Sequence, residues 1–184
     1  MPKILILFAH PAFERSRIHA RLLQAAATVK DVTIRDLYQL YPDFDVLPQV
    51  EQAVLEQHDI ILFQHPFYWY SSPALIKQWL DLVLEHGWAY GKNGTRLQGK
   101  HMMNVLSMGG NEAAYTPQGH HGHSIKEFLL PFERTAGLCN MNYLPPFLVH
   151  GSNTLNDQQL GEYAARYVQL LEQLKTPQLG IPQP

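Results

Sequence analysis

The sequence of 184 residues has little cysteine, no strong excess of either charge and no long apolar run, and each shortage excludes a class of protein. Cys139 is the only cysteine, so no disulfide can form within the chain and a reducing compartment is expected. The formal net charge is −2, so we expect no basic surface and no nucleic-acid partner. The apolar run at 4–8 is far shorter than the ~18 residues that span a membrane, and it indicates a buried strand. We therefore expect a soluble, cytoplasmic protein.

What the sequence does contain is a regular alternation of apolar strands and amphipathic helices. Continuous apolar runs are typical of parallel strands covered on both faces, and apolar residues at helical spacing indicate helices with one buried side. The expected strands are 3–9, 32–34, 60–63, 101–107 and 143–149, and the expected helices are 16–30, 47–57, 73–83, 124–136 and 154–174. This alternation predicts an α/β fold with a flavodoxin-like, five-stranded parallel sheet of order 2-1-3-4-5 and helices on both faces. We expect residues 1–175 to form one domain and residues 176–184 a loose tail.

Three loops are expected to meet at the carboxyl edge of this sheet, where ligands bind in open α/β folds. The first loop begins at His10 and leads into a helix whose free N–H groups favour an anion. Ser16 and Arg17 suit a phosphate group; alternatively, Ser16 only caps the helix and Arg17 is solvated. No G-x-G-x-x-G motif is present, so a phosphate monoester, as on FMN, fits this turn better than a pyrophosphate.

The second loop carries the strongest signal, because four aromatic residues follow directly after Pro66: Phe67, Tyr68, Trp69 and Tyr70. Four consecutive rings cannot all enter the core, so some are expected to face the crevice and to bind a flat ring system. The alternative is a packed aromatic plug or a contact between subunits.

The third loop is small and rich in glycine, and it contains Ser107, Met108, Gly109 and Gly110. Paired glycines let backbone N–H groups approach a ligand closely, although the same pair also makes a simple turn. Tyr115 and a group of histidines follow: His120, His121 and His123. Their spacing is not that of common zinc sites, so we expect no metal.

Four stretches resemble one family closely: LYQLYPDF at 37–44, QHPFYWY at 64–70, WAYG at 88–91 and LPPF at 144–147. They are similar to the NAD(P)H:quinone oxidoreductases with a flavodoxin-like fold. Within that family they most resemble the short bacterial members that act as ancillary subunits of glutathione-regulated potassium efflux systems. The resemblance implies a noncovalently bound flavin, with FMN favoured over FAD, NAD(P)H as co-substrate and a quinone as acceptor.

The resemblance also implies roles for individual residues. On the phosphate side of the flavin it places His10, Ser16, Arg17, Ile18 and His19; along the ring and ribityl chain Pro66, Phe67, Tyr68, Trp69 and Tyr70; and on the pyrimidine side Ser107, Met108, Gly109 and Gly110. Tyr115 and His121 match the tyrosine and histidine credited in the family with assisting hydride transfer, where a phenol or imidazole stabilises developing charge. Four positions depart from the family pattern: Arg17 is untypical, His19 replaces an asparagine, and Ser107 with Met108 replaces a pair of threonines.

These residues and the resemblance they carry support two roles. The first is a homodimeric, FMN-dependent NAD(P)H dehydrogenase (quinone) that transfers hydride in two half-reactions. The second is a regulatory subunit that docks on a membrane potassium-efflux transporter, at the inner face of the cell membrane. A one-electron carrier of the flavodoxin type is less favoured, because such carriers are usually strongly acidic and this chain has a net charge of only −2.

Overall fold

The computed structural model describes residues 1–176, and its helices and strands alternate as the sequence predicts. The strands are β1 (Ile4–Phe8), β2 (Val32–Asp36), β3 (Ile60–Pro66), β4 (His101–Ser107), β5 (Asn142–Tyr143) and β6 (Phe147–Val149). The α-helices are α1 (Arg17–Ala26), α2 (Leu37–Leu40), α3 (Pro48–Glu56), α4 (Ala74–Val83), α5 (Ile125–Phe128), α6 (Leu130–Leu138) and α7 (Asp157–Leu174). Two short 3-10 helices, η1 (Phe13–Arg15) and η2 (Glu112–Tyr115), follow β1 and β4. Apart from Thr176, the predicted tail lies outside the described residues.

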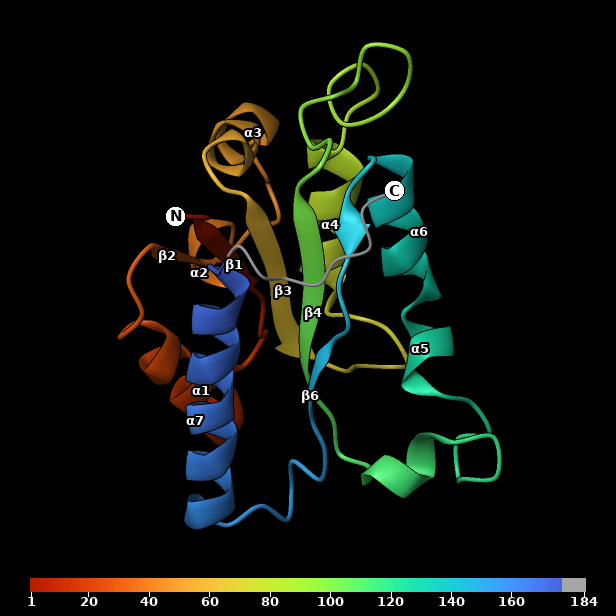
Figure 1. The fold of residues 1–184 in the computed structure, drawn as a ribbon. Helices are drawn as coiled ribbons and strands as arrows, with labels where there is room; N and C mark the ends of the chain where they lie inside the picture. Colours follow the sequence, from red (N-terminus) through yellow and green to blue (C-terminus); the bar gives the residue numbers. More distant parts are fainter. Residues whose placement is uncertain (177–184) are drawn as a thin grey trace.

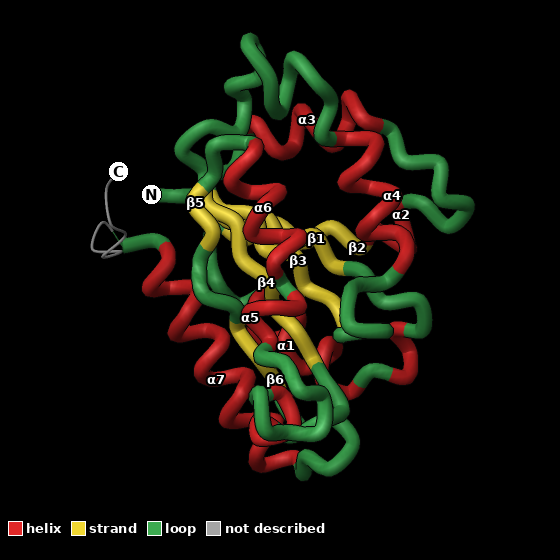
Figure 2. Tube along the Cα trace, turned by 90° about the vertical axis from the view of Figure 1, so that its right-hand side faces the viewer, coloured by secondary structure: helices red, strands yellow, loops and turns green. Residues whose placement is uncertain are grey.

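The strands form one parallel sheet in the order β2-β1-β3-β4-β5, which confirms the predicted fold and strand order. Figure 1 shows α1 and α7 on one side of the sheet and α4 and α6 on the other. Figure 2, turned by 90°, shows the loops gathered at the two ends of the sheet. The long loops therefore do not cover the faces of the sheet, and those at the carboxyl edge are free to shape a binding site.

The core forms two layers because side chains alternate across each buried strand. In β1, Ile4, Ile6 and Phe8 pack against α1 and α7, whereas Leu5 and Leu7 pack with α3, α4 and α6. All five are fully buried, which explains why the strand reads as a continuous apolar run.

Two predicted elements are each divided in the structure, and a proline accompanies both divisions. The fifth strand was expected to be continuous, but β5 and β6 pair with β4 one after the other and are separated by Leu144, Pro145 and Pro146. Proline has no N–H to contribute to a sheet ladder, so the pairing is interrupted there. The helix expected at 124–136 is likewise divided at Leu129, and α6 has Pro131 in its first turn.

The helices of residues 1–176 are all too short or too polar to serve as a membrane span.

Candidate functional site

The loops that follow β1, β3, β4 and β6 enclose a pocket of about 480 Å³ at the carboxyl edge of the sheet. In Figure 1 this edge lies at the bottom, where the arrow of β3 ends. The volume falls within the range of about 300–1,000 Å³ that small-molecule and cofactor sites occupy. The pocket is lined by nine of the fourteen predicted cofactor-binding residues: His10, Ser16, Arg17, Ile18, Pro66, Phe67, Tyr68, Ser107 and Gly109.

One end of the pocket is formed by the N-terminus of α1. Ser16 caps this helix, because its Oγ accepts a hydrogen bond from the His19 N–H over 3.2 Å. Arg15 and Arg17 line the same end. A helix N-terminus flanked by a hydroxyl and two cationic residues favours an anion such as a phosphate group.

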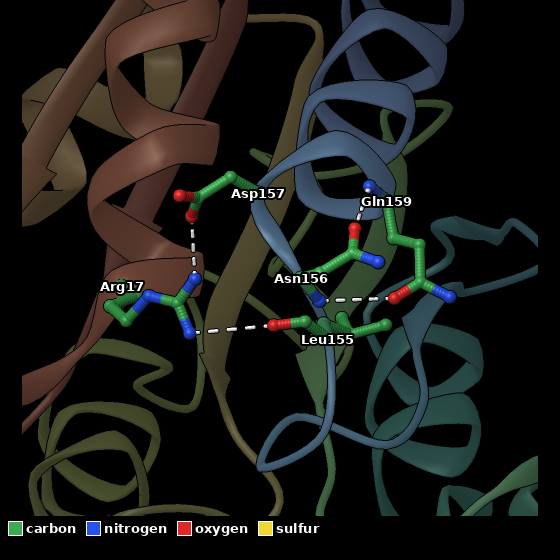
Figure 3. A network of polar contacts seen from close by, with 5 residues as sticks. All are labelled: Arg17, Leu155, Asn156, Asp157 and Gln159. Carbon is green, nitrogen blue, oxygen red and sulfur yellow. Dashed lines mark hydrogen bonds and ion pairs between the residues drawn. The ribbon is translucent and has the colours of Figure 1, made fainter.

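Arg17 also makes a contact outside the pocket, as Figure 3 shows. Its guanidinium pairs with Asp157 at 2.6 Å and donates to the Leu155 carbonyl at 3.4 Å, which links the N-termini of α1 and α7. Both charged side chains are more than half exposed, and such pairs contribute only ~0–1 kcal/mol. An anion in the pocket can therefore compete with Asp157 for this guanidinium.

The aromatic loop divides between the pocket and the solvent. Phe67 and Tyr68 line the pocket, and the Tyr68 ring lies 6.0 Å from that of His10. Trp69 is 93% exposed at the tip of a tight turn, which the Ser71 N–H closes on the Tyr68 carbonyl at 2.9 Å. Trp69 and Tyr70 have φ angles of 50° and 60°, a left-handed conformation that bulky side chains avoid. The turn holds strained backbone next to the pocket, as functional sites often do.

Replacing Trp69 with asparagine is expected to raise the free energy of unfolding by about 1 kcal/mol, because asparagine tolerates the left-handed conformation. Trp69 is almost fully exposed, so little packing is lost. Guanidinium denaturation of the flavin-free protein measures the change. The matched control is Trp69→Phe, which removes the indole but keeps a bulky side chain at the same backbone angle. If the two variants are equally stable, the left-handed backbone at Trp69 is not strained by its bulky side chain.

The glycine-rich loop places only part of its backbone at the pocket. Ser107 and Gly109 line it, whereas the Met108 side chain is buried in the core and its N–H donates to the Val149 carbonyl over 2.9 Å. Gly110 is required for a different reason: a Cβ there would lie 2.9 Å from the ring of Tyr115. Gly110 thus makes room for Tyr115 rather than lining the pocket.

Tyr115 and His121 form an aromatic cluster beside the pocket. Their rings stack with centroids 4.5 Å apart, and the Tyr70 hydroxyl lies 3.4 Å from Nδ1 of His121. Phe67 joins this cluster to the pocket, because its ring lies 5.8 Å from that of Tyr115. Burial raises the pKa of the Tyr115 phenol, which therefore remains a hydrogen-bond donor at neutral pH. In the part of the chain that the structure describes, no group of acidic, histidine or cysteine side chains is arranged to hold a metal ion.

His19 does not line the pocket but lies in the core behind it. Its side chain is fully buried, with Nε2 2.9 Å from Ser107 Oγ and Nδ1 3.3 Å from Gln64 Nε2. His65 is buried in the same way, with Nδ1 2.9 Å from the Pro66 carbonyl. Burial lowers the pKa of His19 to about 3 and that of His65 to about 4, so both rings are neutral at physiological pH.

These two histidines are expected to make the fold less stable in mild acid. Their pKa values are lower in the folded protein than the ordinary 6.5, so below pH 6.5 the unfolded chain binds more protons. Between pH 7.5 and pH 5, each is expected to remove about 2 kcal/mol from the free energy of unfolding. Denaturation at both pH values measures the loss, and His19→Asn should abolish its share. A stability that does not change with pH would contradict the prediction.

Four residues that line the pocket were not predicted: Ala12, Arg15, Ser152 and Asn153. The first two lie within the predicted first loop, which begins at His10. Ser152 and Asn153 belong to the loop after β6, and the Asn153 amide would lie 3.5 Å from a Cβ at Gly109. The polar sequence Gly-Ser-Asn at 151–153, one residue after the last strand, was a usable signal, because that strand also ends at the carboxyl edge.

A doubly wound parallel sheet, with a phosphate-suited helix end and an aromatic loop around one pocket, defines a flavodoxin-like α/β protein. The chain belongs to the family described as having a flavodoxin-like fold, which it matches over residues 2–171. It is 44% identical over 166 residues to the uncharacterized NAD(P)H oxidoreductase YdeQ of Bacillus subtilis (strain 168), covering 90% of this chain and 84% of that one.

Two solved structures are similar to this chain in both sequence and fold. General stress protein 14 from Treponema denticola, in complex with FMN, is 39% identical with a TM-score of 0.90 over 95% of this chain and 100% of that chain. An NADPH-quinone reductase from P. pentosaceus is 33% identical with a TM-score of 0.84 over 91% of this chain and 96% of that chain. The protein is therefore a flavodoxin-like oxidoreductase.

Proposed function

We propose that the pocket binds FMN and that the protein uses it to transfer hydride from NAD(P)H to a quinone. The observation that carries this proposal is the enclosure of one pocket by an anion-binding helix end, two aromatic side chains and a glycine-containing turn. Support comes from general stress protein 14, whose structure contains FMN, and from the relatives named as an NAD(P)H oxidoreductase and an NADPH-quinone reductase. FMN supplies the hydride acceptor and donor when bound, and the chain supplies binding, orientation and charge stabilisation.

The pocket residues can be assigned to the parts of FMN by their chemistry. The α1 N-terminus, Ser16 and the two arginines are suited to the phosphate monoester, because they combine free N–H groups, a hydroxyl and positive charge. Phe67 and Tyr68 offer apolar faces and backbone to the ring system. Ser107 and Gly109 offer a hydroxyl and an uncovered backbone to polar atoms at the edge of the ring.

In this proposal Tyr115 and His121 are the residues that assist hydride transfer. The Tyr115 phenol stays protonated and donates a hydrogen bond to the oxygen on which negative charge develops, as in an oxyanion hole. His121 stacks on Tyr115 and holds its ring in place. Gly110 keeps the space that the Tyr115 ring occupies.

We further propose that the protein is a cytoplasmic homodimer. The exposed apolar side chains of Trp69, Leu130 and Leu138 lie on the aromatic turn and on α6, and they suit a contact between two copies. A quinone and NAD(P)H would then reach the flavin in turn from the same open side.

A second proposed role is that of an ancillary subunit of a glutathione-regulated potassium efflux system, docked at the inner face of the membrane. It is supported by the resemblance of residues 37–44, 64–70, 88–91 and 144–147 to that subgroup. Co-expression of the catalytically impaired double variant Tyr115→Phe/His121→Ala with such a transporter tests this role. Unchanged activation of efflux indicates that docking alone regulates, whereas no effect of the wild-type protein on efflux contradicts the role.

The main proposal is tested with the purified protein. FMN is added, excess flavin is removed by gel filtration, and the visible spectrum is recorded before and after anaerobic addition of NADPH and then of a quinone. Retained flavin absorbance that bleaches with NADPH and returns with the quinone is expected. A protein that retains no flavin contradicts FMN binding, and retained flavin that is reduced but not reoxidised by quinones contradicts only the acceptor.

A further inference from the structure

A series of buried polar side chains runs from α7 through the core to the pocket. The Tyr167 hydroxyl on α7 donates to Gln64 Oε1 at 2.9 Å, and Gln64 Nε2 lies 3.3 Å from His19 Nδ1. His19 Nε2 in turn lies 2.9 Å from Ser107 Oγ. Tyr167, Gln64 and His19 are fully buried, whereas Ser107 lines the pocket. This series of hydrogen bonds therefore connects the core to one polar atom at the pocket wall, Ser107 Oγ.

The chemistry of the groups sets the direction of these hydrogen bonds. A buried phenol must place its hydrogen on an acceptor, and among residues 1–176 the Tyr167 hydroxyl has only Gln64 as a partner. Tyr167 therefore donates to the amide carbonyl, and the amide nitrogen of Gln64, which can only donate, faces His19 Nδ1. The His19 ring is neutral, so its one hydrogen is on Nε2 and points at Ser107 Oγ.

We propose that this chain fixes Ser107 as a hydrogen-bond donor into the pocket, so that the pocket selects a ligand with an acceptor oxygen at that point. Since Ser107 Oγ already accepts from His19, its own hydrogen is free and needs an acceptor. The inference rests on the proposed flavin site, and under it the acceptor is an oxygen of FMN. Tyr167, Gln64 and His19 are positioning residues, because they act only through Ser107.

A second buried chain provides a matched comparison on the other face of the sheet. Tyr143 donates to Asn104 Oδ1 at 2.7 Å, Asn104 Nδ2 lies 3.2 Å from His65 Nε2, and His65 Nδ1 lies 2.9 Å from the Pro66 carbonyl. The order tyrosine, amide, histidine is the same, but this chain ends on a carbonyl that can only accept. The His65 hydrogen therefore stays on Nδ1 even without Tyr143, whereas the His19 chain can reverse, because Ser107 can donate or accept.

The test uses nitrogen NMR of histidine-labelled protein, with His19→Asn and His65→Gln to assign the signals. In the wild-type protein we expect His19 protonated at Nε2. In Tyr167→Phe the direction of the hydrogen bonds from Gln64 to Ser107 is no longer imposed, so both His19 tautomers should appear. Binding of FMN should shift the equilibrium back to the Nε2-protonated form. In Tyr143→Phe, His65 should remain protonated at Nδ1.

FMN affinity, measured by quenching of flavin fluorescence, provides the second readout. Ser107→Ala should weaken FMN binding about tenfold through the loss of one hydrogen bond. Tyr167→Phe should weaken it only about twofold, because about half of the molecules keep the productive direction. Tyr143→Phe should leave it unchanged. If the wild-type protein does not bind FMN, the proposed function is contradicted. If it binds FMN but His19 is protonated at Nδ1, this inference alone is contradicted. The same holds if Ser107→Ala binds FMN with the same affinity as the wild-type protein.

Discussion

Replacing Glu51 with alanine is expected to lower the free energy of unfolding by about 3–5 kcal/mol, the largest loss we expect from any single substitution outside the apolar core. Glu51 is fully buried on α3, and its carboxylate accepts hydrogen bonds from three side chains. Both nitrogens of the Arg35 fork reach it, Tyr41 donates at 2.5 Å and the Trp79 indole donates at 3.0 Å. Alanine would leave the mostly buried Arg35 cation uncompensated and two further donors unpaired.

Thermal unfolding of the variant provides the measurement, with an expected decrease in Tm of roughly 10 °C. The matched control is Lys77→Ala, which breaks the exposed pair between Lys77 and Asp81 on α4 and should cost less than about 1 kcal/mol. If Glu51→Ala were no less stable than Lys77→Ala, the carboxylate would not be the centre of this network.

The Glu51 network illustrates what the sequence leaves undetermined in the fold. The alternation of strands and helices was predictable, because the central strands β1, β3 and β4 are buried on both faces and contain apolar runs. A glutamate in an amphipathic helix is normally solvated, and nothing in the local pattern distinguishes Glu51 from Glu56, which is exposed. Its partners are Arg35 on β2, Tyr41 directly after α2, and Trp79 on α4. Only the tertiary arrangement brings them together.

The same limit applies to the candidate site. Its location was predictable, because loops after parallel strands meet at the carboxyl edge. The direction of each side chain was not. His19 lies one residue beyond Ile18, yet the helix turns its ring into the core, where it meets Ser107. Two separate departures from the family pattern, His19 and Ser107, are thus in direct contact, which the sequence alone did not indicate.

Replacing Tyr115 with phenylalanine is expected to lower kcat for NADPH-dependent quinone reduction about 100-fold, the effect of removing one donor from an oxyanion hole. The variant keeps the ring that packs against Phe67 and stacks on His121, so the loss reports the hydroxyl alone. Stopped-flow reduction of the flavin by NADPH measures the step directly. Retention of FMN at the wild-type level shows that the pocket is intact.

Activity of Tyr115→Phe within about threefold of the wild-type protein would contradict the proposed role of the phenol, because the loss of one such donor lowers kcat by about 100-fold or more. His123→Ala is the control, since His123 is exposed and pairs with Glu127 on α5. His121→Ala should also slow the reaction, because the Tyr115 ring loses the imidazole stacked 4.5 Å away. If His121 acts by holding Tyr115, the double variant should be little slower than Tyr115→Phe alone, whereas independent roles would multiply the two losses.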